Sequence, residues 1–158
     1  MSSASIHIRL AELSDIPHIQ ALFRETVLQV NARDYTEEQV SVWALQAELD
    51  FLWMEKLSET HFLLAILNGR LAGFGSLTTD CNIEMLYTAV DAQGQGVASR
   101  LLGELEAEAR RRGYEWLVTD ASLTARRVFE RCGFELLREQ TVDVRGAPFT
   151  NYKMMKGL

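Results

Sequence analysis

The sequence predicts an α/β domain built around a mixed sheet, and three observations carry this prediction. Short apolar runs typical of strands stand between longer amphipathic stretches typical of helices. The strand-like runs come both singly and in adjacent groups, so we expect the sheet to be mixed rather than wholly parallel. The 158 residues contain no repeat, low-complexity segment or linker, which favours a single domain over residues 1–158.

The first part of the chain predicts one strand followed by helices. Ile6–Leu10 alternates as a half-buried strand does, and Pro17 lies in the first turn of the helix expected after it. Thr36, three residues before Gln39, forms a capping box that begins a second helix. Residues 51–57 are expected to be helical as well.

The middle of the chain predicts three strands, a glycine-rich loop and a long helix. Asn68 and Gly69 separate two strand-like runs, which is a strong hairpin signal. The apolar run 82–90 predicts a third strand and leads into the loop QGQGVAS at residues 93–99. Apolar residues at helical spacing then predict a helix that ends near Gly113.

The last part of the chain predicts a strand, a short helix and a final hairpin. The strand is expected over residues 114–120 and the helix over residues 122–131. The hairpin is expected from residues 134–143 and 148–155, with its turn at Gly146.

Composition argues against several classes of protein and partner. The formal net charge of −6 disfavours a nucleic-acid partner, because such proteins present a basic face. No apolar run approaches the ~20 residues of a membrane span, and the N-terminus lacks the features of a signal peptide. Cys81 and Cys132 lack ligand-like spacing. We therefore expect a cytoplasmic protein with no metal, nucleic-acid or membrane partner, present as a monomer or homodimer.

The glycine-rich loop is a candidate phosphate site. The first turn of a helix presents unpaired N–H groups and about half a positive charge, and Gly94, Gly96 and Ala98 would let a phosphate approach that backbone. The alternative is a tight turn with small residues. A Walker A loop would need Gly-Lys-Ser/Thr where this chain has Ala-Ser-Arg. A Rossmann fingerprint would want Gly or Ala at Ser99, yet Asp120 lies where a ribose-binding acid could stand, so a dinucleotide-binding half-domain remains an alternative.

A wider resemblance favours another phosphate-binding pattern. Gln93, Gly96 and Ala98 satisfy Q/R-x-x-G-x-G/A, which resembles the pyrophosphate-binding motif of the GNAT N-acetyltransferase superfamily. ARRVFERCGFELL (residues 125–137) resembles its A-x-x-x-Y-E-x-x-G-F segment, NGRLAGFGSL its central hairpin, and IHIRLAELSDIPHIQAL its opening strand and helix. The patterns WAL…FLWMEKL and VRGAPFTNYKM are further similar to the YafP-like branch. The resemblance implies the GNAT fold, a mixed and mostly antiparallel sheet of six or seven strands with about four flanking helices.

The resemblance also implies an activity, which is transfer of an acetyl group from acetyl-coenzyme A to an amine by direct attack. A small-molecule acceptor is favoured over a protein acceptor by family analogy. The backbone amide of Thr88 is expected to stabilise the oxyanion. The residues implied to bind the cofactor are Leu86, Tyr87, Thr88, Gln93, Gly94, Gln95, Gly96, Val97, Ala98, Ser99, Ser122 and Phe129.

Glu84 is the candidate general base, because an ammonium must lose a proton before it attacks. If the strand alternates regularly, Glu84 shares a face with Leu86 and Thr88, and several GNAT enzymes carry a base at the matching position, acting directly or through a water. The alternative is a solvated strand carboxylate.

The sequence departs from the family pattern at the expected general acid. Many members have a tyrosine where this chain has Phe129, which carries no proton to give. Cys132, Tyr152 and Ser122 are the side chains that could replace it, and water is a further source of the proton. Because Phe129 cannot act as the general acid, a non-catalytic acyl-coenzyme A sensor on the same fold is an alternative function. Ser122 would either contact the cofactor or cap the following helix.

The acceptor pocket is expected between the first two helices and the C-terminal hairpin. Aromatic residues belong to the core more often than to a pocket lining, so Asn151 and Tyr152 are better placed for polar contacts with an acceptor. The candidate acceptor-binding residues are Tyr35, Trp43, Phe149, Asn151 and Tyr152.

Overall fold

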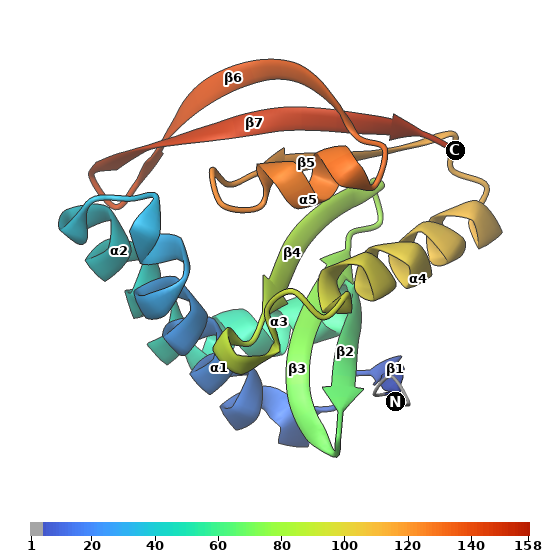
Figure 1. Ribbon diagram of the computed structural model, residues 1–158, viewed down its shortest axis with the longest axis horizontal. Helices are drawn as coiled ribbons and strands as arrows, with labels where there is room; N and C mark the ends of the chain where they lie inside the picture. The colour runs from blue at the N-terminus through green and yellow to red at the C-terminus, as the bar shows by residue number, and fades with distance from the viewer. Residues whose placement is uncertain (1–4) are drawn as a thin grey trace.

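The computed structural model describes residues 5–158 and shows one seven-stranded sheet with helices on both faces (Figure 1). The strand order is β1-β2-β3-β4-β5-β7-β6, and every neighbouring pair is antiparallel except β4 and β5, which are parallel. The expectation of a mixed, mostly antiparallel sheet is therefore confirmed.

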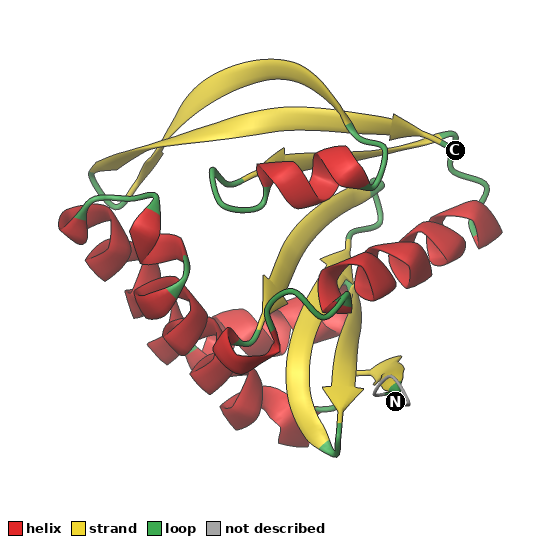
Figure 2. Cartoon of the chain, in the orientation of Figure 1, coloured by secondary structure: helices red, strands yellow, loops and turns green. Residues whose placement is uncertain are grey.

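The elements alternate along the chain much as the sequence predicts (Figure 2). The strands are β1 (Ile6–Leu10), β2 (His61–Leu67), β3 (Arg70–Leu77), β4 (Asn82–Thr88), β5 (Trp116–Ala121), β6 (Glu135–Val144) and β7 (Ala147–Gly157). The α-helices are α1 (Ile16–Gln29), α2 (Glu37–Ala44), α3 (Asp50–Glu59), α4 (Val97–Arg111) and α5 (Arg126–Arg131). No helix within residues 5–158 is long and apolar enough to cross a bilayer.

Local signals set several element boundaries. The Gln39 N–H donates to Thr36 Oγ1 at 3.2 Å, and the Thr36 N–H donates to Gln39 Oε1 at 2.8 Å, so the capping box that begins α2 is confirmed. Asn68 and Gly69 have φ of 54° and 74°, the left-handed pair that a two-residue hairpin requires. Gly113, at φ 78°, follows the end of α4.

Two hydrophobic clusters cover the two faces of the sheet. Along β2, Leu63 and Ala65 belong to the cluster under α4, whereas Phe62 and Leu64 belong to the cluster with α1, α2 and α3. Alternate residues of a strand point to opposite faces, so one strand supplies both clusters. We call these faces the α4 face and the α1 face.

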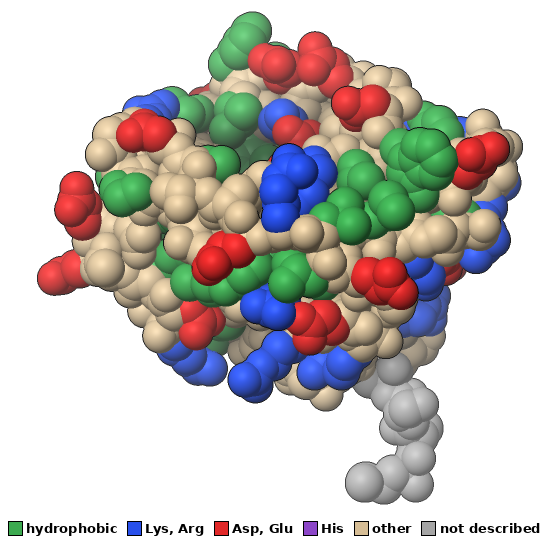
Figure 3. Space-filling view, turned by 90° about the horizontal axis from the view of Figure 1, so that it is seen from above, with side chains coloured by type: hydrophobic (Ala, Val, Ile, Leu, Met, Phe, Trp, Pro, Cys, Tyr) green, Lys and Arg blue, Asp and Glu red, His purple; other side chains and the backbone are tan. Residues whose placement is uncertain are grey.

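The outer hairpin of β6 and β7 carries charges of both signs. Seen from above, acidic and basic side chains are interspersed over this side of the molecule (Figure 3). This side therefore presents no broad field of a single sign.

The strands β4 and β5 pair only briefly, and this positions the site. Their parallel register joins Asn82 to Val118 and Ile83 to Thr119, and no pairing follows toward the end of β4. The remainder of β4 therefore leaves one backbone edge facing a gap between the two strands.

Candidate functional site

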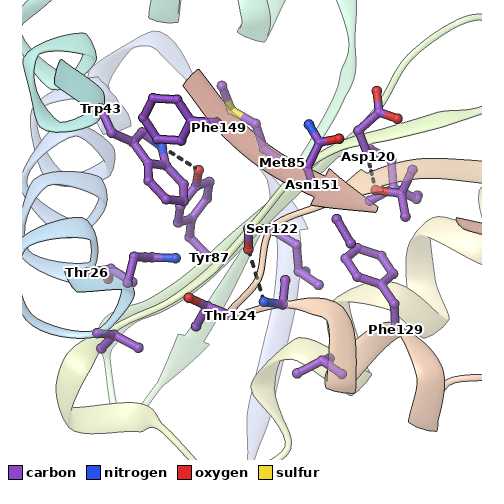
Figure 4. Close-up of a pocket in the computed structure, with 18 of the residues that line it drawn as sticks. Thr26, Trp43, Met85, Tyr87, Asp120, Ser122, Thr124, Phe129, Phe149 and Asn151 are labelled. Atoms are coloured by element: carbon purple, nitrogen blue, oxygen red, sulfur yellow. Dashed lines mark hydrogen bonds between the residues drawn. The ribbon is translucent and has the colours of Figure 1, made fainter. Parts of the chain in front are cut away.

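A cavity lies where β4 and β5 diverge, and it holds about 1130 Å³ of space including its opening to solvent. Residues of α1 and α2, β4 and β5, the start of α4, α5 and the β6–β7 hairpin line it, and Figure 4 shows the side chains that meet there. Segments far apart in the sequence therefore enclose one space.

The loop before α4 presents backbone N–H groups with no partner in the protein. The first backbone bond of α4 runs from the Arg100 N–H to the Gly96 C=O at 3.0 Å, so the earlier N–H groups have no acceptor inside the helix. Within the part of the chain that the structure describes, no N–H of residues 93–99 finds a backbone or side-chain acceptor. The loop is therefore free to hold an anion at the positive end of a 15-residue helix.

Backbone conformation explains the glycines of this loop. Gly94 and Gly96 have φ of 73° and 82°, and a Cβ at either position would meet nothing within 4 Å. Left-handed backbone, rather than crowding by the protein, therefore calls for glycine. The open space leaves the loop accessible to a ligand.

Gln93 braces the loop against the end of β4. Its Nε2 donates to the Thr88 C=O at 2.8 Å and to the Ala89 C=O at 3.3 Å. The side chain is thus used within the protein, and the Gln93 N–H is the group left for a ligand.

The exposed edge of β4 follows from its register with β3. The Ala89 N–H donates to the Ala72 C=O of β3 at 2.7 Å. Along an antiparallel strand the backbone groups of successive residues point to opposite edges, so the residues before Ala89 face the gap and β3 in turn. Leu86 and Thr88 turn toward the gap, whereas Tyr87 turns toward β3. The Thr88 C=O is already bonded to Thr26 and Gln93, which leaves its N–H facing the gap.

An irregularity in β4 changes the orientation of Glu84. Ser76 pairs with Met85 and Leu77 with Ile83, so Glu84 is an extra residue between two registered pairs. Its carboxylate forms an ion pair with Lys56 of α3, on the α1 face, whereas Leu86 packs with the α4 cluster. The expectation that Glu84 shares a face with Leu86 is wrong, because it assumed regular alternation.

Aromatic side chains form one wall of the cavity. The Tyr35 ring lies 5.1 Å from that of Trp43 and 5.8 Å from that of Phe149, and Trp43 Nε1 donates to the Tyr87 hydroxyl at 3.2 Å. Burial raises the pKa of Tyr87 well above its ordinary value, so its phenol stays protonated. The predicted residues Tyr35, Trp43 and Phe149 therefore come together at the cavity.

Asn151 also lines the cavity, but Tyr152 does not. Tyr152 pairs with Ala121, whose side chain packs in the α4 cluster, and the Arg126 guanidinium lies 4.3 Å from the Tyr152 ring centroid. Strand alternation thus turns Tyr152 to the α4 face and Asn151 to the α1 face. The grouping of Tyr152 with the acceptor residues, and its candidacy as a proton donor in this cavity, are corrected accordingly.

The other candidate proton donors are constrained by local contacts. Ser122 Oγ accepts a bond from the Ala125 N–H at 3.0 Å, which is the helix-capping alternative. Phe129 is 2% exposed and packs edge to face against Phe134, with 5.1 Å between centroids, although it also lines the cavity. Cys132 lies in a separate hollow, with its Sγ 3.9 Å from Ser99 Oγ. Ser122 alone of the named proton donors lines the cavity.

Sequence reasoning missed several lining residues because distant pairing places them. Asn31 follows α1 and is 5% exposed, and Asp120 lies one residue before the end of β5. Thr124 Oγ1 donates to Asp34 Oδ2 at 2.7 Å, which ties the segment after α1 to the loop after β5. The other missed lining residues include Thr26, Gln46, Met85, Thr119, Val142 and Val144.

Comparison with known proteins identifies the family. Residues 31–156 match the acetyltransferase (GNAT) domain. The uncharacterized N-acetyltransferase YafP of Escherichia coli (strain K12) is 36% identical over 151 residues, covering 95% of each chain. The chain belongs to the GNAT acetyltransferase family. It is an acyltransferase of the YafP-like branch, as the loop and downstream motifs predicted.

Solved structures of this family share the fold over the whole chain. A GCN5-related N-acetyltransferase from Rhodopseudomonas palustris is 34% identical with a TM-score of 0.91, covering 100% of this chain and 98% of that one. The PaiA N-acetyltransferase from Thermoplasma acidophilum, solved in complex with coenzyme A, is 19% identical with a TM-score of 0.80, covering 98% and 99%. The GNAT fold is confirmed, and the dinucleotide-binding half-domain is excluded.

Proposed function

We propose that this GNAT protein transfers the acetyl group of acetyl-coenzyme A to the amine of a small molecule by direct attack. The observation that carries the proposal is the row of unpaired N–H groups at residues 93–99, next to the open edge of β4. These groups suit the pyrophosphate, and the edge at Leu86 and Thr88 suits the arm that carries the thioester.

The unpaired N–H groups of residues 93–99 and the open edge of β4 support acetyl-coenzyme A as the cofactor. When bound, acetyl-coenzyme A supplies an activated thioester. The Thr88 N–H faces the gap and would donate to the oxygen of that thioester as negative charge develops on it. Asn151 and the aromatic wall of Tyr35, Trp43 and Phe149 would orient the acceptor from the α1 face.

The proton leaving the amine would pass to Glu84. This residue lines the cavity two positions before Leu86, at most about 7 Å along the strand because the extra residue shortens the rise, and a water would relay the proton. The amine nitrogen forms a bond to the acetyl carbon, the carbon–sulfur bond breaks, and water protonates the departing thiolate. Water takes that role because Phe129 has no proton to give, Cys132 and Tyr152 lie outside the cavity, and the Ser122 oxygen is held by the Ala125 N–H.

Paired substitutions at Gly96 test the anion site. Asp and Asn are the non-glycine residues best able to adopt its φ of 82°, and they differ from each other in charge. We expect Gly96→Asp to weaken coenzyme A binding at least about tenfold more than Gly96→Asn, measured by calorimetry, because a carboxylate would meet the phosphates. Equal affinities in the two variants would contradict the proposed site.

Product formation tests the reaction itself. We would incubate the protein with acetyl-coenzyme A and a panel of amines, follow thiol release, and confirm the acetylated amine by mass spectrometry. Release of thiol with an N-acetylated product supports the proposal. Tight coenzyme A binding without product from any amine would instead support the non-catalytic sensor.

A further inference from the structure

Oxygen atoms able to accept hydrogen bonds gather at one end of the cavity. Asp120 of β5 pairs with Lys153 of β7, and Asn151 lies two residues from Lys153, so the side chains of Asp120 and Asn151 share the α1 face. Figure 4 shows these two side chains beside each other, apart from Trp43 and Tyr87. The cavity thus has a polar end and an aromatic end.

These oxygens have unused capacity. Asn151 Oδ1 is buried without a hydrogen-bond partner among residues 5–158. Asp120 Oδ1 accepts from Gln140 Nε2 at 2.9 Å and lies 3.4 Å from Lys153 Nζ, whereas no described residue donates to its Oδ2. Leaving buried acceptors unpaired costs free energy, so a ligand that brings donors would restore the missing bonds.

Hydrogen-bond acceptors without donors, rather than net charge, favour a cationic ligand at this end, because Lys56 and Lys153 already pair with the two carboxylates. Glu84 and Asp120 line the cavity, and none of its described lining residues is a lysine, arginine or histidine. Lys56 and Lys153 contact these two carboxylates from outside the lining. A carboxylate on the acetyl-accepting substrate would find no lysine, arginine or histidine among the described lining residues. An ammonium on that substrate would find several oxygens able to accept its hydrogen bonds.

The position of Asp120 sets the length of the ligand. Ile83 and Thr119 are registered partners, so Asp120 lies level with Glu84, two residues along β4 from Leu86. That separation is at most about 7 Å along β4, and the gap to β5 adds at least about 5 Å at right angles. The two positions therefore lie roughly 7 to 9 Å apart, the reach of a diamine with a chain of about five or six carbon atoms. The aromatic wall gives such a chain an apolar surface.

We infer that the acceptor is a diamine, with one nitrogen placed for acetylation at Leu86 and Thr88 and a second ammonium bound by Asp120 and Asn151. This inference rests on the proposed function, because the first nitrogen is the one that is acetylated. It assigns Asp120 and Asn151 as the residues that determine specificity.

Binding tests the inference separately from catalysis. Protein saturated with coenzyme A would be titrated by calorimetry with cadaverine, pentylamine and aminopentanoate, which share a five-carbon chain and differ in the distal group. We expect cadaverine to bind at least about tenfold more tightly than either of the others, because it gains charge-assisted hydrogen bonds.

Matched variants identify the distal site. Asp120→Asn and Asn151→Leu should each reduce the preference for cadaverine over pentylamine to near one. Glu139→Gln makes the same charge change on the same hairpin but pairs with Tyr152 on the α4 face, so it should keep the preference. Thermal unfolding checks folding, and Asn151→Leu should not lower the midpoint, because it removes an unpaired oxygen.

The outcomes separate the two proposals. Equal binding of cadaverine and pentylamine, or a preference that survives both Asp120→Asn and Asn151→Leu, overturns the diamine inference. Acetylation of pentylamine without any preference for cadaverine also overturns it and leaves acetyl transfer standing. Preferential binding of cadaverine without an acetylated product supports the distal site and contradicts the proposed reaction.

Discussion

At the scale of single residues, Glu84 owes its place to an irregularity rather than to strand periodicity. The extra residue in β4 turns its carboxylate to the α1 face, where Lys56 holds it. The same face carries the aromatic wall and Asn151, so the carboxylate lies on the side from which an acceptor would approach. The ion pair fixes the orientation of Glu84 without enclosing it, since the carboxylate is 27% exposed.

Glu84→Gln tests the proposed base. We expect kcat at neutral pH to fall about a hundredfold, the lower end of the usual effect of a general base, and to recover toward the wild-type rate as alkaline pH deprotonates the amine. Initial rates across a pH series would measure this. Glu55→Gln, an exposed change on the neighbouring helix α3, is the control and should behave as wild type. A Glu84→Gln profile that matches wild type would remove Glu84 from the mechanism.

At the scale of elements, close contact between β3, β4 and α4 holds the open edge of β4 in place. A Cβ at Gly73 would lie 2.7 Å from the Tyr87 C=O and 2.7 Å from Val97 Cγ1. Only a residue without a side chain lets β3 approach both β4 and the first turn of α4. The same glycine therefore supports the edge at Leu86 and the start of α4, where the anion site is proposed.

Gly73→Ala should destabilise the protein. We expect the free energy of unfolding to fall by about 2 kcal/mol, because neither the Tyr87 carbonyl nor the Val97 side chain can move freely away. Chemical denaturation would measure the change. Gly103→Ala, within α4 and with nothing near its Cβ position, should instead stabilise by about 0.5 to 1 kcal/mol. Similar effects at the two positions would contradict this account.

The junction of β1 with α1 carries a pH-dependent contact. Arg9 donates two bonds of 2.8 Å to the Asp15 carboxylate, which also accepts the Glu12 N–H. The Arg9 hydrogen bonds hold the pKa of Asp15 below its ordinary value of 3.8. Because the pKa of Asp15 is lower in the folded state than in the unfolded state, the ionised carboxylate stabilises the fold at pH values above 3.8. This contribution disappears as the pH falls through the pKa of the folded state.

Asp15→Asn should therefore lower the free energy of unfolding by about 1 kcal/mol at neutral pH, and the two proteins should converge in acid as the wild-type carboxyl is protonated. Urea unfolding at pH 7 and at about pH 3 would measure both differences. An unchanged gap between the two proteins at the lower pH would contradict the role of the charged carboxylate.

The sequence predicts those elements whose signals are local. The capping box at Thr36 and the turn at Asn68 depend on neighbouring residues, and the loop motif predicted the unpaired N–H groups that the structure shows before α4. The orientations of other site residues depend on pairing with strands that are distant in the sequence. The extra residue at Glu84 depends on the register with β3, and the placement of Tyr152 on the α4 face depends on the register with β5. Neither register can be deduced from one strand alone.

At the scale of the whole molecule, contacts between distant segments close the cavity. Gln39 Nε2 donates to the Pro148 C=O at 2.7 Å, and the Leu123 N–H donates to the Tyr35 hydroxyl at 2.8 Å. The first bond joins α2 to the tip of the last hairpin, and the second joins the segment after α1 to the loop after β5. The side of the cavity proposed to bind the acceptor is therefore assembled from both ends of the chain.

The placement of the two binding surfaces has a kinetic consequence. Helix α4, whose first turn offers the unpaired N–H groups, covers one side of the sheet, and the aromatic wall lies on the other. Donor and acceptor would thus use separate entrances and occupy the enzyme simultaneously. Double-reciprocal plots at several fixed concentrations of one substrate should intersect. Parallel lines would indicate a substituted-enzyme route, in which the first product departs before the second substrate arrives.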